Sequence, residues 1–216
     1  VVIVPSIAKD QWHKRLQCSM MSYNNRYELM QAVNIAHMLM KECIKEGDLV
    51  IDATSGNGHD TLFLSTCVGT KGEVIAIDIQ EEAIHSTQRL ILQHERVNVK
   101  YMQMNHADMG SKLQECLGNI ACISYNLGYL PGAEDHSIIT SSQSTIQALD
   151  ASCSLLNDEG CISVIAYRGH PHGLEESHAV EQWMQALSPR EWHVIAIEAV
   201  NQSNTSPIVF FARKKH

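Results

Sequence analysis

Residues 48–61 read Asp-Leu-Val-Ile-Asp-Ala-Thr-Ser-Gly-Asn-Gly-His-Asp-Thr, an apolar run followed by a glycine-containing turn. The apolar run ends near Asp52, and the two glycines are Gly56 and Gly58. Glycine lets the backbone turn sharply and lets a ligand approach where a side chain would clash. A helix that begins near Gly58 presents its unpaired N–H groups to a carboxylate or a phosphate. This stretch therefore predicts a strand, a ligand-binding loop and a helix, in that order.

The rest of the chain repeats this alternation of short apolar runs with longer amphipathic segments. The apolar runs are residues 48–54, 73–79, 98–104, 120–126 and 161–167. The helical candidates lie near residues 27–45, 58–68, 80–94, 107–117, 140–156 and 174–187. Most of the runs are rich in Val and Ile without polar alternation, as strands covered on both faces require. The alternation predicts a mostly parallel sheet with right-handed crossovers and helices on both faces.

The C-terminal end breaks the alternation. Residues 193–200 and 208–212 are strand-like, and the polar, turn-rich segment 201–207 between them leaves no room for a helix. The last two strands must form a hairpin, which places one antiparallel strand in the sheet. The predicted fold class is therefore α/β: a Rossmann-like sheet of seven mostly parallel strands with a C-terminal antiparallel hairpin.

Length and charge limit the class of protein. The chain has 216 residues, which suits one domain, and we assign residues 1–26 to an N-terminal extension and residues 27–216 to the domain. With 16 Lys and Arg against 24 Asp and Glu, the net charge of −8 argues against the uniformly basic surface of a general nucleic-acid binder. No apolar run approaches the roughly 18 residues that a membrane-spanning helix needs, so no membrane partner is expected.

The seven cysteines include no C-x-x-C pair, so neither a zinc ribbon nor a redox motif is indicated. Free thiols favour a reduced, intracellular compartment. We expect the cytoplasm, or an organelle (plastid or mitochondrion) if a targeting segment has been removed ahead of Val1.

A second acidic residue supports a nucleoside cofactor at the glycine turn. Asp78 closes the next apolar run, 22 residues beyond Gly56, where a carboxylate can accept both ribose hydroxyls of an adenosine. NAD binds with similar spacing, and an ordinary structural turn is a further alternative. Three points favour S-adenosylmethionine. Thr61 stands where the dinucleotide fingerprint has its third glycine, Asp52 suits a cationic ligand but would repel a pyrophosphate, and methyltransferase sheets end with an antiparallel strand.

Polar residues near the strand ends complete the predicted cofactor site. Asn105 and His106 follow the third run, where such folds often flank the adenine ring. The full predicted cofactor-binding set is Asp52, Thr54, Gly56, Asn57, Gly58, His59, Asp60, Thr61, Asp78, Ile79, Gln80, Asn105 and His106. By contrast, we expect His37 to be an ordinary core or surface histidine. We expect residues 140–145 to cap a helix, with contact between their hydroxyls and the substrate as the alternative.

The fourth apolar run ends in Asn126-Leu-Gly-Tyr-Leu-Pro-Gly132. In a doubly wound sheet this segment faces the ligand, because ligands lie beyond the carboxyl ends of the strands. It resembles the Asn/Asp-Pro-Pro-Tyr loop of amino-directed methyltransferases, in which the Asn oxygen and the following carbonyl hold an amine and the aromatic ring stacks on a base. We predict that Asn126, Leu127 and Tyr129 are catalytic and that Tyr129 and Pro131 contact the substrate. A turn with a buried tyrosine is the alternative.

A third cluster, Tyr167-Arg-Gly-His-Pro-His-Gly173, follows the fifth run. Tyr167 or His170 could contact the substrate, and Arg168 could meet a phosphate. Simple loop packing is the alternative. We expect no metal, because no carboxylate or cysteine nearby has ligand-like spacing.

In this order, the motifs resemble those of one family. Residues 52–61, 78–80, 126–132, 144–145 and 167–173 are similar to segments of tRNA methyltransferases that are often described as rRNA methylases. Members act on 5-aminomethyl-(2-thio)uridine at the wobble position, and the likeness runs from about residue 27 to residue 214. The resemblance implies a class I methyltransferase that uses S-adenosylmethionine, binds the tRNA anticodon region and forms a methylaminomethyl uridine. It also implies that Asp52, Gly56, Gly58, Asp78 and Gln80 surround the cofactor and that Asn126, Leu127 and Tyr129 hold the aminomethyl group.

Two other functions stay open at this point. The acidic net charge fits a small-molecule N-methyltransferase more comfortably than an RNA-modifying enzyme. A non-catalytic S-adenosylmethionine-binding module is the third alternative, and the intact segment 126–132 argues against it. Folds of this class often dimerise, so a homodimer is open as well.

Overall fold

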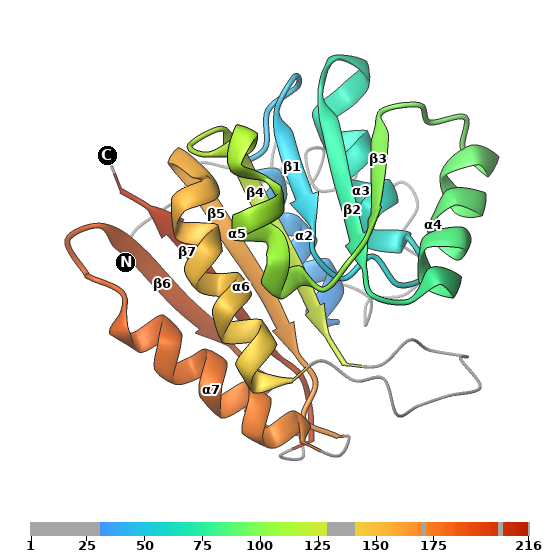
Figure 1. Ribbon diagram of the computed structural model, residues 1–216. Helices are drawn as coiled ribbons and strands as arrows, with labels where there is room; N and C mark the ends of the chain where they lie inside the picture. Colours follow the sequence, from blue (N-terminus) through green and yellow to red (C-terminus); the bar gives the residue numbers. More distant parts are fainter. Residues whose placement is uncertain (1–30, 129–140, 170–171, 203–204, 216) are drawn as a thin grey trace, which may run out of the picture.

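A sheet of seven strands runs through the centre of the computed structural model, which describes residues 31–128, 141–169, 172–202 and 205–215 (Figure 1). The strands are β1 (Leu49–Asp52), β2 (Glu73–Asp78), β3 (Val99–Gln103), β4 (Ile120–Leu127), β5 (Leu156–Ala166), β6 (Trp192–Ile197) and β7 (Ile208–Lys214). The α-helices are α2 (Ala32–Lys41), α3 (His59–Val68), α4 (Glu81–Gln93), α5 (Met109–Lys112), α6 (Ser142–Leu155) and α7 (Gly173–Ala186). Single turns of 3-10 helix are η2 (Gly69–Lys71), η3 (His106–Asp108) and η4 (Gln114–Cys116).

The strand order is β3-β2-β1-β4-β5-β7-β6. The strand β7 is antiparallel to β5 and β6, and the other neighbouring pairs are parallel. This arrangement confirms the predicted α/β sheet and its C-terminal antiparallel hairpin. The chain moves outward from β1 to β2 and β3 and then returns to β4, so the direction of winding reverses between β1 and β4. Ligands of doubly wound folds bind at this reversal, beyond the carboxyl ends of the strands.

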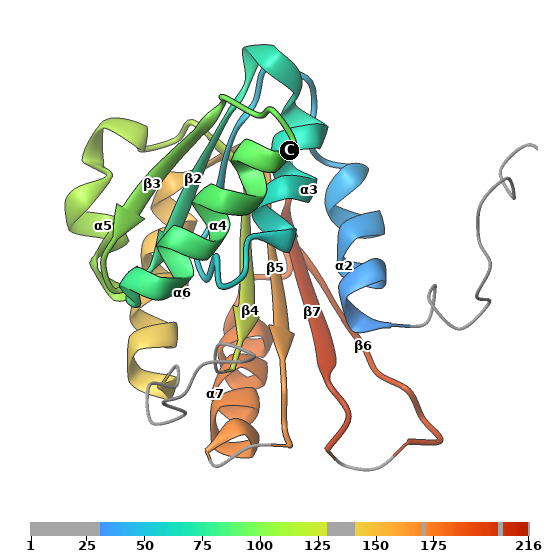
Figure 2. The same cartoon turned by 90° about the vertical axis from the view of Figure 1, so that its right-hand side faces the viewer.

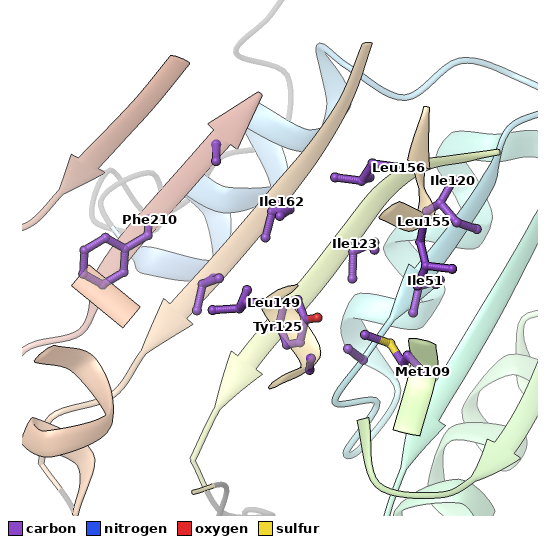
Figure 3. Packing of buried hydrophobic residues seen from close by; sticks show 14 of the residues in the cluster. Ile51, Met109, Ile120, Ile123, Tyr125, Leu149, Leu155, Leu156, Ile162 and Phe210 are labelled. Carbon is purple, nitrogen blue, oxygen red and sulfur yellow. The ribbon is translucent and has the colours of Figure 1, made fainter. Parts of the chain in front are cut away.

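Helices cover both faces of the sheet (Figures 1 and 2). Helices α2, α3 and α4 lie on one face, and α5, α6 and α7 lie on the other. The central strands are buried on both faces, because alternate residues point into two separate cores. Along β4, Cys122 belongs to the core beneath α2 and α3, whereas Ile123 and Tyr125 belong to the core beneath α5, α6 and α7. Figure 3 shows Tyr125 among Leu149 and other apolar side chains of that second core.

Most elements lie within a few residues of the predicted ranges, and two differ from them most. The helix expected over residues 107–117 is only the short α5 between two 3-10 turns, because Leu113 leaves the helical conformation (φ −118°, ψ 35°) and its side chain is buried in the core. The strand expected from residue 161 begins at Leu156, directly after α6, and its first residue pairs with Ile120. Within the described ranges, no helix is long and apolar enough to cross a membrane.

Gly58 is the residue at which the loop after β1 packs against α4. Its φ is +87°, and a Cβ added there would lie 2.8 Å from the Cα of Thr87 on α4. We expect Gly58→Ala to lower the free energy of unfolding by roughly 2 kcal/mol or more, because the substitution adds both backbone strain and a clash with main chain. Thermal and denaturant unfolding measure the loss.

The matched control is Gly118→Ala. Gly118 also has a positive φ of +70°, but an added Cβ there would meet nothing within 4 Å. Gly118→Ala therefore adds backbone strain but no clash, and it should lower the free energy of unfolding less than Gly58→Ala does. Equal losses in the two variants would contradict the packing role of Gly58.

Candidate active site

A cavity of about 600 Å³ lies at the carboxyl ends of the central strands, a size typical of small-ligand sites. The predicted site residues that line it are Thr54, Gly56, Asn57, His59, Asp60, Asp78, Gln80, Asn126, Leu127 and Tyr167. The lining residues that sequence reasoning missed are Gln31, Val33, Asn34, Ser55, Gly128, Gly169 and Thr205. The structure thus brings the glycine loop, the acid of β2 and the ends of β4 and β5 around one cavity.

Asp52 lies beneath the glycine loop and does not line the cavity. Its Oδ2 accepts a hydrogen bond from the Thr61 hydroxyl at 2.5 Å, and its Oδ1 accepts one from the Thr54 N–H at 3.3 Å. Burial, reinforced by the negative charge of Asp60, raises the pKa of Asp52 to about 7. Asp52 and Thr61 were both predicted to contact the cofactor. They join the two arms of the loop beneath it, the arm that leaves β1 at Thr54 and the arm that enters α3 at Thr61.

Asp78 closes β2 and faces the cavity. Its Oδ2 accepts a hydrogen bond from the Gly56 N–H at 2.9 Å, and its Oδ1 accepts one from the Gln80 N–H at 3.0 Å. Burial raises the pKa of this carboxyl. Each carboxylate oxygen keeps a further lone pair after these bonds. The carboxyl group of Asp78 therefore has acceptor capacity for the two hydroxyls of a ribose. Ile79, the next residue, is 52% exposed.

Asn126 at the end of β4 is held at two points. Its backbone N–H donates to the Thr54 hydroxyl at 2.7 Å, and its side-chain Nδ2 donates to Oδ2 of Asp60 at 3.0 Å. Because an ionised carboxylate only accepts hydrogen bonds, the amide nitrogen has to face Asp60. The amide oxygen therefore points the other way, and it has no hydrogen-bond partner among the described residues.

Apart from Arg168, the remaining predicted substrate residues fall into two groups. The side chain of Leu127 is buried in the core, so its main chain is what it offers to the cavity. Tyr167 lines the cavity at the end of β5, and its pKa is raised by burial and by the charge of Asp60. The other three residues, Tyr129, Pro131 and His170, lie outside the described residues.

Arg168 does not line the cavity. Its Nε donates to the carbonyl of Ser206 at 2.7 Å, and its Nη2 donates to the Glu198 carboxylate at 3.2 Å. The guanidinium thus ties the end of β5 to the connection between β6 and β7. The phosphate contact predicted for Arg168 would have to compete with these two bonds.

Asn105 and His106 also lie outside the cavity lining. The Asn105 side chain accepts a hydrogen bond from the Ala107 N–H at 2.9 Å and so caps η3. The ring of His106 is buried, with its edge against Tyr125, and burial lowers its pKa to about 4. The adenine contact predicted for this pair stays a prediction.

His37 on α2 is a site neighbour that sequence reasoning missed. Its Nε2 donates to Oδ1 of Asp60 at 2.7 Å, and its ring stacks on Phe63 with a centroid separation of 3.8 Å. The histidine is therefore satisfied, as expected, but its partner belongs to the site. The contact spans 23 residues, so no local pattern could have revealed it.

The segment expected to cap a helix does so. Ser141 is the N-cap of α6 and accepts a hydrogen bond from the Ser144 N–H in a capping box. The hydroxyl of Thr145 donates to the buried Glu176 carboxylate at 2.7 Å. Across the part of the chain that the structure describes, no group of three or more His, Cys, Asp or Glu side chains is arranged to hold a metal ion.

Comparison with protein-family models shows which family the chain belongs to. The model of the family described as "Putative rRNA methylase" matches residues 74–213, about two thirds of the chain. This chain belongs to that family. The model of the protein-L-isoaspartate (D-aspartate) O-methyltransferase family also matches residues 11–112. The family resemblance drawn from the motifs is confirmed.

Individual relatives agree with the assignment. The chloroplastic tRNA (mnm5s2U34)-methyltransferase of Arabidopsis thaliana is 37% identical over 195 residues, which cover 86% of this chain and 70% of the relative. A solved structure of the same family description, from Clostridium thermocellum, is 35% identical with a TM-score of 0.81 and covers 86% of this chain and 98% of its own. A methyltransferase structure from Streptococcus mutans, in complex with SAH, is 28% identical with a TM-score of 0.76 and the same coverage. The protein is a class I S-adenosylmethionine-dependent methyltransferase, as predicted.

Asp52 gives the stability of this methyltransferase a pH dependence. Because its pKa in the folded protein, about 7, exceeds its ordinary value of 3.8, the folded state retains a proton that the unfolded chain has lost between those values. The contribution of Asp52 to stability is therefore greatest in acid and is lost as the pH rises through about 7. Asp52→Asn keeps a hydrogen-bond acceptor for Thr54 and a partner for Thr61 but carries no charge.

We expect the wild-type protein to lose stability relative to Asp52→Asn, on the order of a few kcal/mol, as the pH rises from about 5 to 8. Denaturant unfolding of both proteins across this range measures the difference, in which the contributions of titrating groups remote from Asp52 cancel. A difference that does not change with pH would contradict the raised pKa.

Proposed function

We propose that this methyltransferase acts on the amine of 5-aminomethyl-(2-thio)uridine at the wobble position of tRNA and gives 5-methylaminomethyl-(2-thio)uridine. The observation that carries the proposal is the Asn126 amide, which lines the cavity and donates its N–H to Asp60, so that its oxygen is directed away from Asp60 and has no partner among the described residues. The name of the Arabidopsis relative, a tRNA (mnm5s2U34)-methyltransferase, supports this choice of substrate. That relative is described as chloroplastic, which supports the organelle location among the two that we expected.

The residues around the glycine loop fit the cofactor. The Asp78 carboxylate would hold the ribose hydroxyls, and the loop at Gly56 would leave room for the ligand. S-adenosylmethionine supplies a methyl group on cationic sulfur. When the methyl group passes to the amine, its bond to sulfur breaks and a bond to nitrogen forms. The nitrogen then releases a proton to water. No metal and no covalent intermediate on the protein is needed.

The acceptor amine has to be deprotonated and correctly directed before it can react. The Asn126 oxygen would accept one amine N–H, and the Leu127 carbonyl is a candidate second acceptor. Two acceptors direct the nitrogen lone pair, so these residues contribute by orientation rather than by proton transfer. Tyr167, at the end of the neighbouring strand, is an aromatic surface against which an unpaired uridine would stack.

Asn126→Ala tests the assignment. We expect kcat for methyl transfer to fall about 100-fold, because the amide oxygen is removed from a preorganised site. The affinity for S-adenosylhomocysteine should stay within about threefold, since the ribose acceptors on Asp78 are untouched. The measurement is mass spectrometry of wobble nucleosides after tRNA carrying the aminomethyl group has been incubated with S-adenosylmethionine.

The control is Asn119→Ala, which removes an exposed asparagine just before the opposite end of the same strand and should leave methylation unchanged. If Asn126→Ala methylates tRNA at the wild-type rate, the amine-binding role is wrong. The acidic net charge keeps a small-molecule acceptor as the second candidate. Wild-type protein that methylates amines in a metabolite extract, but not tRNA, would replace the proposed substrate with a small molecule.

A further inference from the structure

Three elements of the fold converge on the carboxylate of Asp60. Asp60 lies in the first turn of α3 and is only 7% exposed. One of its oxygens accepts a hydrogen bond from His37 of α2 at 2.7 Å, and the other accepts one from Asn126 of β4 at 3.0 Å. These partners lie 23 residues before Asp60 and 66 residues after it. The site therefore contains a continuous chain of hydrogen bonds, His37–Asp60–Asn126, that ends at the cavity.

The orientation of the Asn126 amide depends on this chain. The oxygen and nitrogen of an amide have nearly the same shape, so packing alone does not decide which of them faces the cavity. A carboxylate decides it, because it repels the amide oxygen and accepts from the amide nitrogen. An amide turned the other way would present N–H donors to an amine whose own N–H groups need acceptors.

His37 in turn holds the carboxylate. Its ring is parallel to that of Phe63, with an angle of 2° between the planes, so the direction of its Nε2 is fixed by packing. The hydrogen bond from Nε2 keeps one carboxylate oxygen toward α2, which leaves the other aligned with the Asn126 nitrogen. This second oxygen is the one on which the amide orientation depends.

We propose that His37 and Asp60 are positioning residues, which set the Asn126 amide with its oxygen toward the acceptor amine. The proposal deepens the function proposed above and rests on it, since it assumes an amine acceptor. Asn126 makes the contact with the substrate, and the other two residues act through it.

Two substitutions of His37 separate this role from simple packing. His37→Phe keeps an aromatic ring against Phe63 but removes the hydrogen bond to Asp60. His37→Gln removes the ring but keeps an N–H donor. We expect His37→Phe to lower kcat about tenfold with little change in the KM for tRNA, and His37→Gln to stay within about threefold of the wild type.

A role in packing alone predicts the reverse order, with His37→Phe active and His37→Gln impaired, and that result would overturn the proposal. The control is His178→Gln, which changes an exposed histidine on α7 and should leave kcat unchanged. Affinity for S-adenosylhomocysteine, measured by calorimetry on each variant, reports whether the cofactor site has stayed folded.

Asp60→Asn supplies a second test that does not depend on the stability of the His37 variants. We expect it to lower kcat at least tenfold, because an amide at position 60 no longer fixes the orientation of the Asn126 amide. Adding His37→Phe to Asp60→Asn should then cost little more, since His37 acts through Asp60. If the loss of kcat in the double variant equals the product of the two single losses, His37 acts independently of Asp60 and the proposal is wrong.

The two proposals fail in different ways. If the wild-type protein does not methylate aminomethyl-uridine in tRNA, the proposed function is wrong. If the wild type is active and both His37→Phe and Asp60→Asn keep wild-type kcat, only the positioning role is wrong.

Discussion

The loop after β1 keeps its shape because one buried carboxylate accepts hydrogen bonds from both of its arms. Asp52 bonds the Thr54 N–H on the strand side and the Thr61 hydroxyl on the helix side. The hydroxyl of Thr54 then accepts the backbone N–H of Asn126, so the same network reaches the end of β4. The raised pKa of Asp52 follows from placing an acid under this loop, away from water. Cofactor loop and acceptor site are therefore one connected structure.

Much of the fold could be predicted because the strands that matter are buried on both faces. Such strands appear as unbroken apolar runs, and residues 73–79 and 120–126 correspond closely to β2 and β4. The hairpin followed from the length of the segment between the last two runs. Sequence pattern failed where tertiary packing decided the outcome. Leu113 ends α5 early, because its side chain is buried in the core. The strand β5 begins at Leu156 and so includes the polar residues 157–160, which precede the strand that the sequence predicted.

The candidate site shows the same division. The lining role of Asp78 and Asn126 could be predicted, because each ends a strand at the edge where ligands bind. The partners of the site residues could not be predicted. Nothing near residue 60 indicates that its carboxylate meets residues 37 and 126, and nothing near Arg168 indicates that Glu198 neutralises it. Such pairs depend on how distant elements pack, which one sequence does not encode in any local pattern.

For the proposed reaction, an amide rather than a carboxylate at the contact with the amine resolves a conflict of charge. A carboxylate touching the amine would favour the ammonium form, raise the pKa of the amine and remove the lone pair that has to react. A site without negative charge would instead give no help to the positive charge that develops on nitrogen during transfer. Asn126 provides a neutral acceptor at the contact with the amine. The negative charge of Asp60 lies one hydrogen bond further away, behind Asn126. That arrangement orients the amine without locking it in its unreactive form.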